Sequence, residues 1–139
     1  MKISFDNTKT LEELENDIWK DDKNYPTGLV ERCFKFRKIP VKDLTIEELR
    51  TLIGQNIGLY YLIPIAYEKL KENILAEGNF YAGDLLDAVV RSDKKFWQTN
   101  PLYWKEIVTV INQNADILQK EVSPRSALQK IEDFKSFNF

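Results

Sequence analysis

The 139-residue sequence contains no histidine and only one cysteine. Histidine is the commonest general base near neutral pH and the commonest metal ligand, so Ser-His-Asp and Cys-His catalytic arrangements and histidine zinc sites are excluded within this chain. A single cysteine cannot form an internal disulfide bond. Cys33 stands between Val30 and Phe34 at helical spacing, and we interpret it as a buried structural side chain rather than a reactive thiol.

Long apolar runs and phosphate-binding loops are also missing. The longest nearly apolar stretch spans residues 57–67 and is interrupted by Gly58 and Pro64, whereas a membrane-spanning helix needs about 20 apolar residues. Gly54 and Gly58 are not followed by the Lys-Ser/Thr pair of a phosphate loop. The first seven residues lack the apolar core of a secretory signal. We therefore expect a cytoplasmic protein that does not associate with membranes.

The residues that are present favour helices. Hydrophobic side chains make up 43% of the chain, enough for one core, and no linker or repeat divides it. Thr10 with Glu13, and Thr45 with Glu48, have the spacing of capping boxes. Apolar residues then recur at helical spacing along most of the chain, with almost no alternation of period two. The sequence predicts an all-α fold, a compact single-domain bundle of about six to seven helices over residues 1–139.

Several boundaries follow from local signals. The first helix should carry Leu11, Leu14 and Ile18 on one face, and another should begin just before Pro64. Asp84 is predicted to cap a helix. A long helix should run from Asn100-Pro101 to Leu118, and Ser123-Pro124 should start the last one. Ile3 and Phe5 hint at a strand, but it would have no partner.

The net charge of −2 hides an uneven distribution. Residues 1–28 hold four basic and seven acidic side chains, and the densest acidic cluster should cover the outer side of the first helix and the loop after it. This cluster contributes either to solubility or to a surface complementary to a basic protein partner. The candidate partner-binding residues are Glu12, Glu13, Asp17, Asp21 and Asp22.

Other patterns carry weaker functional signals. Five basic residues lie between Arg32 and Lys42 with two phenylalanines among them, but acidic neighbours and a pI near 5.3 favour a solvated helix face over direct nucleic-acid binding. Asp84 and Asp87 fit the first turn of a helix better than acid–base chemistry. No catalytic residue, cofactor or metal is predicted. The pairs Tyr60-Tyr61, Phe96-Trp97 and Tyr103-Trp104 fit a partner interface or core packing equally well.

Two strings in the middle of the chain are more specific. They are LIGQNIGL at residues 52–59 and FYAGDLL at residues 80–86. Over residues 25–97 the chain resembles small bacterial immunity proteins of contact-dependent growth inhibition systems, although Asn79 and Ala82 stand where an acid and a proline are common in that family. The resemblance implies a protein that acts by binding and has no catalytic residues. Its partner would be a cognate toxin C-terminal domain, delivered into the cell by a neighbouring bacterium.

The motif residues themselves are interpreted as structural. Glycines allow positive φ or a close approach of the backbone, and the Gln-Asn side chains can form hydrogen bonds with the backbone groups left free where the helix is interrupted. The motif residues are Gly54, Gln55, Asn56, Gly58, Phe80, Tyr81, Gly83 and Asp84. Contacts with diverse toxins would then fall at the two ends, residues 1–28 and 98–139. If the toxin is a nuclease, the acidic cluster could mimic nucleic-acid charge.

The leading hypothesis is thus an immunity protein that neutralises its toxin in the cytoplasm by steric or electrostatic occlusion. The alternative is a helical adaptor for an endogenous protein, and an enzyme that uses only carboxylates ranks third.

Overall fold

The chain folds entirely into helices and loops. The computed structural model describes residues 1–122 and 125–138, and within them there are nine α-helices, one short 3₁₀ helix (Val41–Asp43) and no strand. The all-α prediction is confirmed. The α-helices are α1 (Leu11–Glu15), α2 (Gly28–Phe36), α3 (Ile46–Gly54), α4 (Leu59–Glu72), α5 (Asp84–Val90), α6 (Lys94–Thr99), α7 (Pro101–Gln113), α8 (Ala115–Glu121) and α9 (Arg125–Lys135).

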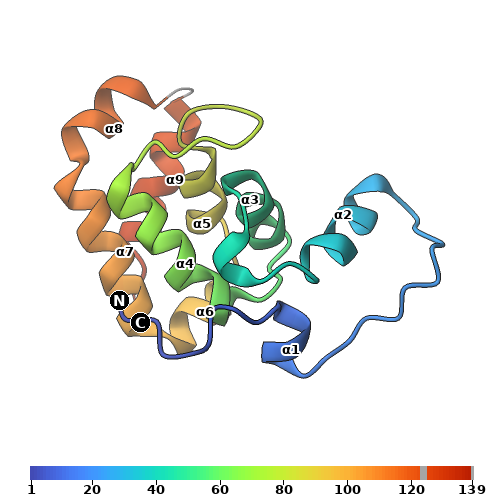
Figure 1. Cartoon of the computed structure of the whole chain (residues 1–139). Helices are drawn as coiled ribbons and strands as arrows, with labels where there is room; N and C mark the ends of the chain where they lie inside the picture. Colours follow the sequence, from blue (N-terminus) through green and yellow to red (C-terminus); the bar gives the residue numbers. More distant parts are fainter. Residues whose placement is uncertain (123–124, 139) are drawn as a thin grey trace.

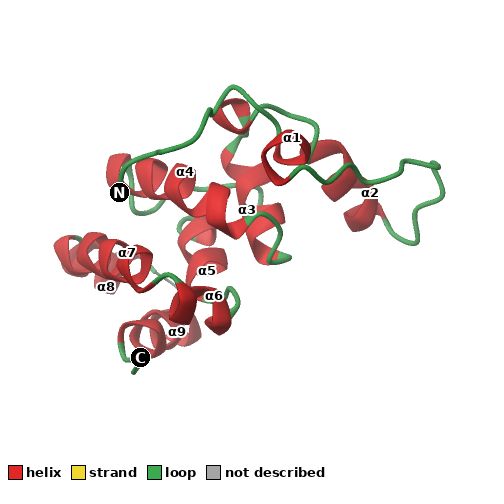
Figure 2. Cartoon of the chain, turned by 90° about the horizontal axis from the view of Figure 1, so that it is seen from below, coloured by secondary structure: helices red, strands yellow, loops and turns green. Residues whose placement is uncertain are grey.

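Helices α3, α4 and α5 occupy the middle of the molecule. Figure 1 shows α7, α8 and α9 on one side of them, while α1, α2 and the loop between these two helices lie on the other. Figure 2 shows the same arrangement from below, with the loop before α2 reaching away from the other helices. Helix α4 is buried along most of its length, and α3 packs most closely against α5. This packing fixes the α3–α5 face on which the site described below is built.

Both predicted capping boxes form. Thr10 Oγ1 accepts a hydrogen bond from the Glu13 amide, and the Glu13 carboxylate accepts one from the Thr10 amide; Thr45 and Glu48 repeat this arrangement at α3. The first helix is nevertheless shorter than predicted. Asn16 adopts a left-handed conformation and closes α1, so Ile18 is 77% exposed and its expected place on the apolar face is wrong.

The predicted start of the fourth helix is also wrong. Gly58 takes a left-handed conformation (φ +64) immediately before α4, so that the helix begins at Leu59, five residues ahead of Pro64. Proline inside a helix lacks the amide donor of its turn. Here its ring is buried in the core, and the helix continues through it to Glu72.

Two further boundaries differ from expectation. Asp84 does not cap α5, because Gly83 at φ +88 occupies the cap position and the Asp84 side chain bonds to the preceding loop instead. The long helix expected up to Leu118 is divided at Asn114 into α7 and α8, and α6 was not predicted. The cap-plus-proline start predicted at Ser123-Pro124 lies outside the described residues.

The N-terminal segment forms no strand. Phe5 instead packs edge-on against Tyr61, with ring centroids 5.2 Å apart, and the isolated bridge of this region joins Thr10 to Pro40. Across the described part of the chain, no helix is both long and apolar enough to cross a membrane.

Candidate functional site

The predicted acidic surface is divided by the structure, because Glu12 is buried rather than on the outer side of α1. Its carboxylate lies 2.6 Å from Lys38 Nζ and 3.9 Å from Nη1 of Arg37. Arg37 is fully buried, and its Nη2 donates to the Glu15 carboxylate and to the Asp17 carbonyl, both at 2.9 Å. Glu12 therefore compensates a buried cation, and its expected exposure is wrong.

The other predicted partner-binding acids are exposed, but several hold the chain locally. Glu13 completes the capping box of α1. Asp21 accepts hydrogen bonds from the Lys23 amide and the Tyr25 hydroxyl, which keeps the pKa of its carboxyl below the ordinary value, and Asp22 accepts one from the Asn24 amide. Asp17, Asp21 and Asp22 thus remain an acidic stretch on the loop between α1 and α2.

The basic stretch predicted as a solvated helix face is largely paired with acids. Lys35 contacts Glu31 at 3.2 Å and Lys42 contacts Asp43 at 3.1 Å. Phe34 is half-buried, and its ring meets those of Trp19 and Tyr25 at 5.1 and 5.3 Å. The aromatics of this stretch therefore pack within the protein.

Cys33 and the predicted aromatic pairs are mostly structural. Cys33 is buried as predicted, and burial raises the pKa of its thiol. Trp97 is fully buried and donates to the Ser92 hydroxyl, while Tyr60 is half-exposed and stacks on Tyr103 at 5.9 Å. The described residues include no group of three or more His, Cys, Asp or Glu side chains placed to hold a metal ion.

The two family-like motifs meet at a groove between α3 and α5. Its volume is about 340 Å³, and its walls come from the end of α3, from the loop after α4 and from one face of α5. The lining residues are Arg50, Gly54, Gln55, Phe80, Tyr81, Asp84, Asp87, Ala88 and Arg91. Five of the motif residues interpreted as structural therefore lie at a surface cavity: Gly54, Gln55, Phe80, Tyr81 and Asp84.

Two carboxylates hold residues 78–81, the loop that forms the rim of this groove. Asp84 is buried and accepts hydrogen bonds from the amides of Gly78 at 2.7 Å and Phe80 at 3.1 Å. Glu47 on α3 accepts one from the Asn79 amide at 2.9 Å. Consecutive backbone amides of the rim are thus held by side chains from two different helices, which fixes its conformation.

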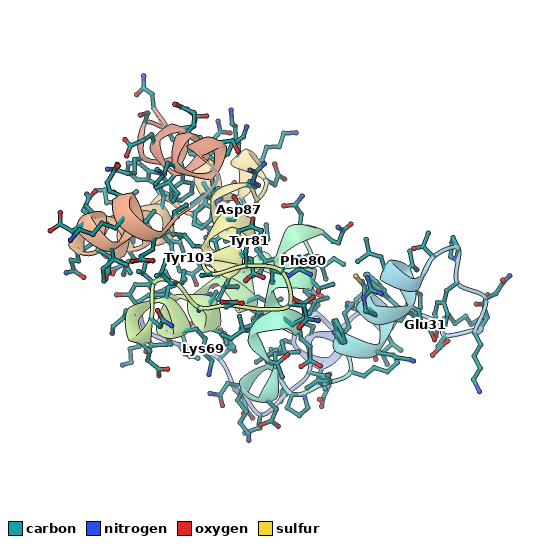
Figure 3. All side chains as sticks on the ribbon, turned by 90° about the horizontal axis from the view of Figure 1, so that it is seen from above. Glu31, Lys69, Phe80, Tyr81, Asp87 and Tyr103 are labelled. Carbon is teal, nitrogen blue, oxygen red and sulfur yellow. The ribbon has the colours of Figure 1, made fainter. Side chains whose placement is uncertain are left out.

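Arginine and tyrosine complete the groove. The Arg50 guanidinium forms two hydrogen bonds to Glu47, at 2.6 and 2.7 Å, and lies 4.4 Å from the centroid of the Phe80 ring. On α5, Asp87 accepts hydrogen bonds from the Tyr81 hydroxyl at 2.7 Å and from Arg91 Nε at 2.8 Å. Figure 3 shows Phe80, Tyr81 and Asp87 close together beside the rim loop.

This arrangement displays aromatic side chains instead of burying them. Phe80 is 67% exposed and Tyr81 37% exposed, although their backbone is fixed. Desolvation and the hydrogen bond to Asp87 raise the pKa of Tyr81 to about 12, so its hydroxyl remains a donor at neutral pH. The geometry is suited to binding another surface, since aromatic and arginine side chains dominate binding energy at protein interfaces.

Two of the remaining motif residues, Asn56 and Gly58, make contacts within the fold. Asn56 has a left-handed conformation, and its side-chain oxygen accepts a hydrogen bond from the Asp93 amide at 2.8 Å, which ties the α3–α4 turn to α6. A Cβ at Gly58 would stand 2.7 Å from Leu11. Arg50 and Arg91 were not among the predicted site residues, although the spacings Glu47-Arg50 and Asp87-Arg91 are those of helical ion pairs.

Residues 13–107, which include both motifs and every residue of the groove, match a family described as CDI immunity proteins. No curated protein matches the chain. Because the match covers more than half of the chain, this protein belongs to the family of CDI immunity proteins.

Proposed function

We propose that this protein binds the toxin domain of a contact-dependent growth inhibition system and neutralises it in the cytoplasm. The observation that carries the proposal, beside family membership, is the rigid display of Phe80 at the groove rim. A phenylalanine that the fold keeps in water contributes little to folding, because its apolar surface is not buried. When a partner covers the ring, burial of this apolar surface contributes to the free energy of binding.

The fixed rim also favours tight binding. Association requires the interface side chains and loops to lose conformational freedom. Glu47 and Asp84 already hold the rim amides, and Arg50 already lies against the Phe80 ring. A toxin that docks here meets a surface which needs little further ordering.

Neutralisation would follow from occlusion rather than from a reaction. A standard protein interface buries about 800 Å² on each partner, so a complex centred on the groove would cover a broad part of the toxin. This would block either its active site or an adjoining surface that the substrate needs. Asp17, Asp21 and Asp22 are exposed on the α1–α2 loop and could steer a basic toxin surface toward the complex.

Growth protection tests the proposal directly. The toxin domain encoded next to this protein is induced in a host that carries the protein, a non-cognate immunity protein, or an empty plasmid. We expect growth only with the present protein, and a stable complex when the purified proteins are mixed. Unprotected growth arrest together with no complex in size-exclusion chromatography would refute the proposal.

A further inference from the structure

We propose that the α3–α5 groove receives an acidic side chain of the toxin domain, that Arg91 pairs with its carboxylate, and that Phe80 and Tyr81 pack against its apolar neighbours. This inference rests on the proposed function and adds the binding surface and the chemistry of the partner residue. Three observations carry it: an open glycine, the hydrogen bonds already made within the groove, and the position of Arg91.

Gly54 is not required by the backbone conformation of the fold, and its missing side chain leaves the groove open. A Cβ at this position would meet no atom within 4 Å, and the residue does not have a positive φ. Gly58 and Gly83 differ, since both adopt left-handed conformations. Glycine within a helix is less favourable than alanine. The absence of a side chain at Gly54 therefore leaves room in the groove that the residue lines.

Most charged groups of the groove are already paired. Both Glu47 oxygens bind Arg50, and Asp84 accepts hydrogen bonds from three rim amides. Each Asp87 oxygen receives a donor, one from Tyr81 and one from Arg91. An incoming lysine or arginine would thus have to share carboxylates that Arg50, Arg91 and the rim amides already engage, which favours an acidic occupant over a basic one.

Arg91 is the exception. It donates through Nε to Asp87, and no described residue accepts a hydrogen bond from its two terminal nitrogens. Its side chain is 45% exposed at the groove wall. A guanidinium whose terminal nitrogens have no acceptor within the described residues can bind a carboxylate in the two-pronged geometry that arginine favours. The contact with Asp87 holds the side chain in place before the toxin arrives.

The groove size suits side chains rather than a large ligand. Sites for small molecules have volumes of about 300–1,000 Å³, and this groove is near the lower limit at about 340 Å³. Phe80 and Tyr81 border the space with exposed rings. A short toxin segment that places Asp or Glu beside an apolar residue satisfies both the charge and the aromatic rim.

Affinity measurements with the purified, catalytically inactive toxin domain test this inference. Gly54→Ala adds one methyl group at the groove wall, so we expect its Kd to rise by about threefold. Gly54→Trp fills the groove, and we expect binding to weaken by about 100-fold or more. Loss of one partner of an interfacial charge pair leaves the other charge uncompensated, so Arg91→Gln should weaken binding at least about 10-fold. Arg91→Lys should recover part of that loss.

Thermal unfolding of each variant shows whether the fold is intact, and the outcomes separate the two proposals. If wild-type protein does not bind the toxin, the proposed function fails. If wild type binds and both Gly54→Trp and Arg91→Gln keep the wild-type Kd, the toxin docks elsewhere and only the groove inference fails. If Gly54→Trp weakens binding while Arg91→Gln does not, the occupant is not a carboxylate, which also overturns the inference.

Discussion

At the scale of single residues, the buried charge of Arg37 has to be compensated by the groups around it. Its guanidinium is fully buried, and its Nε and Nη1 have no hydrogen-bond partner among the described residues. The compensating groups are the Glu15 carboxylate, the nearby charge of Glu12 and the ring of Trp19, whose centroid lies 4.1 Å from the guanidinium carbon. A buried charge is tolerated only when such groups surround it.

Removing Glu12 should therefore destabilise the protein. In Glu12→Ala the buried Arg37 loses a nearby opposite charge and Lys38 loses its 2.6 Å partner. Breaking a buried ion pair typically costs about 3–5 kcal/mol. We expect a loss of about 3 kcal/mol in the free energy of unfolding, measured by urea denaturation. Asp17→Ala is the matched control, because that side chain is exposed, and its cost should stay below about 0.5 kcal/mol. Equal costs for the two variants would contradict this account of Arg37.

At the scale of elements, Glu47 links α3 to the rim loop. Hydrogen bonds from Arg50 lower the pKa of its carboxyl below 4.5, and the bond from the Asn79 amide acts in the same direction. Because the folded pKa is lowered, the stabilisation is fully present above pH 4.5. It shrinks as the pH falls through the folded pKa, since the unfolded chain then binds a proton more readily than the folded one.

Glu47→Gln removes this titration. We expect the wild type to be more stable than Glu47→Gln by about 1–3 kcal/mol at pH 7, and the difference to disappear below the folded pKa. Urea denaturation of both proteins between pH 3 and pH 7 measures it, and acids common to the two proteins cancel in the comparison. Glu77→Gln is a suitable control, because Glu77 is exposed and forms no hydrogen bond or ion pair within the described residues. A stability difference that stays constant across this range would show that Glu47 does not hold the rim through its charge.

The helices and loops also show which structural features can be predicted from the sequence and which cannot. Capping boxes at Thr10 and Thr45 were predicted correctly because both partners lie within four residues of each other. The role of Glu12 was missed because its partner Arg37 lies 25 residues away in the sequence. The groove was missed for the same reason. Its walls come from motifs that are more than 20 residues apart, and nothing in either string indicates which of its residues face solvent.

At the scale of the whole molecule, the fold extends beyond the residues that match the family. The match ends at residue 107, yet α9 packs against α5, the helix that carries Asp84, Asp87 and Arg91. Phe134 on α9 is fully buried, and its ring lies 5.0 Å from that of Trp97. Its carbonyl accepts a hydrogen bond from Trp104 at 2.8 Å. The C-terminal helix thus supports the groove from behind, although it contributes no residue to it.

Replacing phenylalanine by alanine at two positions, one buried and one exposed, should separate the effect on folding from the effect on binding. Phe134→Ala empties a buried site and should lower the free energy of unfolding by about 3–5 kcal/mol, a large share of the roughly 5–15 kcal/mol typical of a domain. Phe80→Ala removes a ring that is 67% exposed. It should cost at most about 1 kcal/mol through the lost contact with Arg50, yet weaken toxin binding by at least 10-fold if Phe80 is an anchor of the interface. Thermal unfolding and toxin titration of both variants, at a temperature where each remains folded, measure the two effects. If Phe80→Ala bound the toxin as tightly as wild type, exposure of this ring would have no part in toxin recognition.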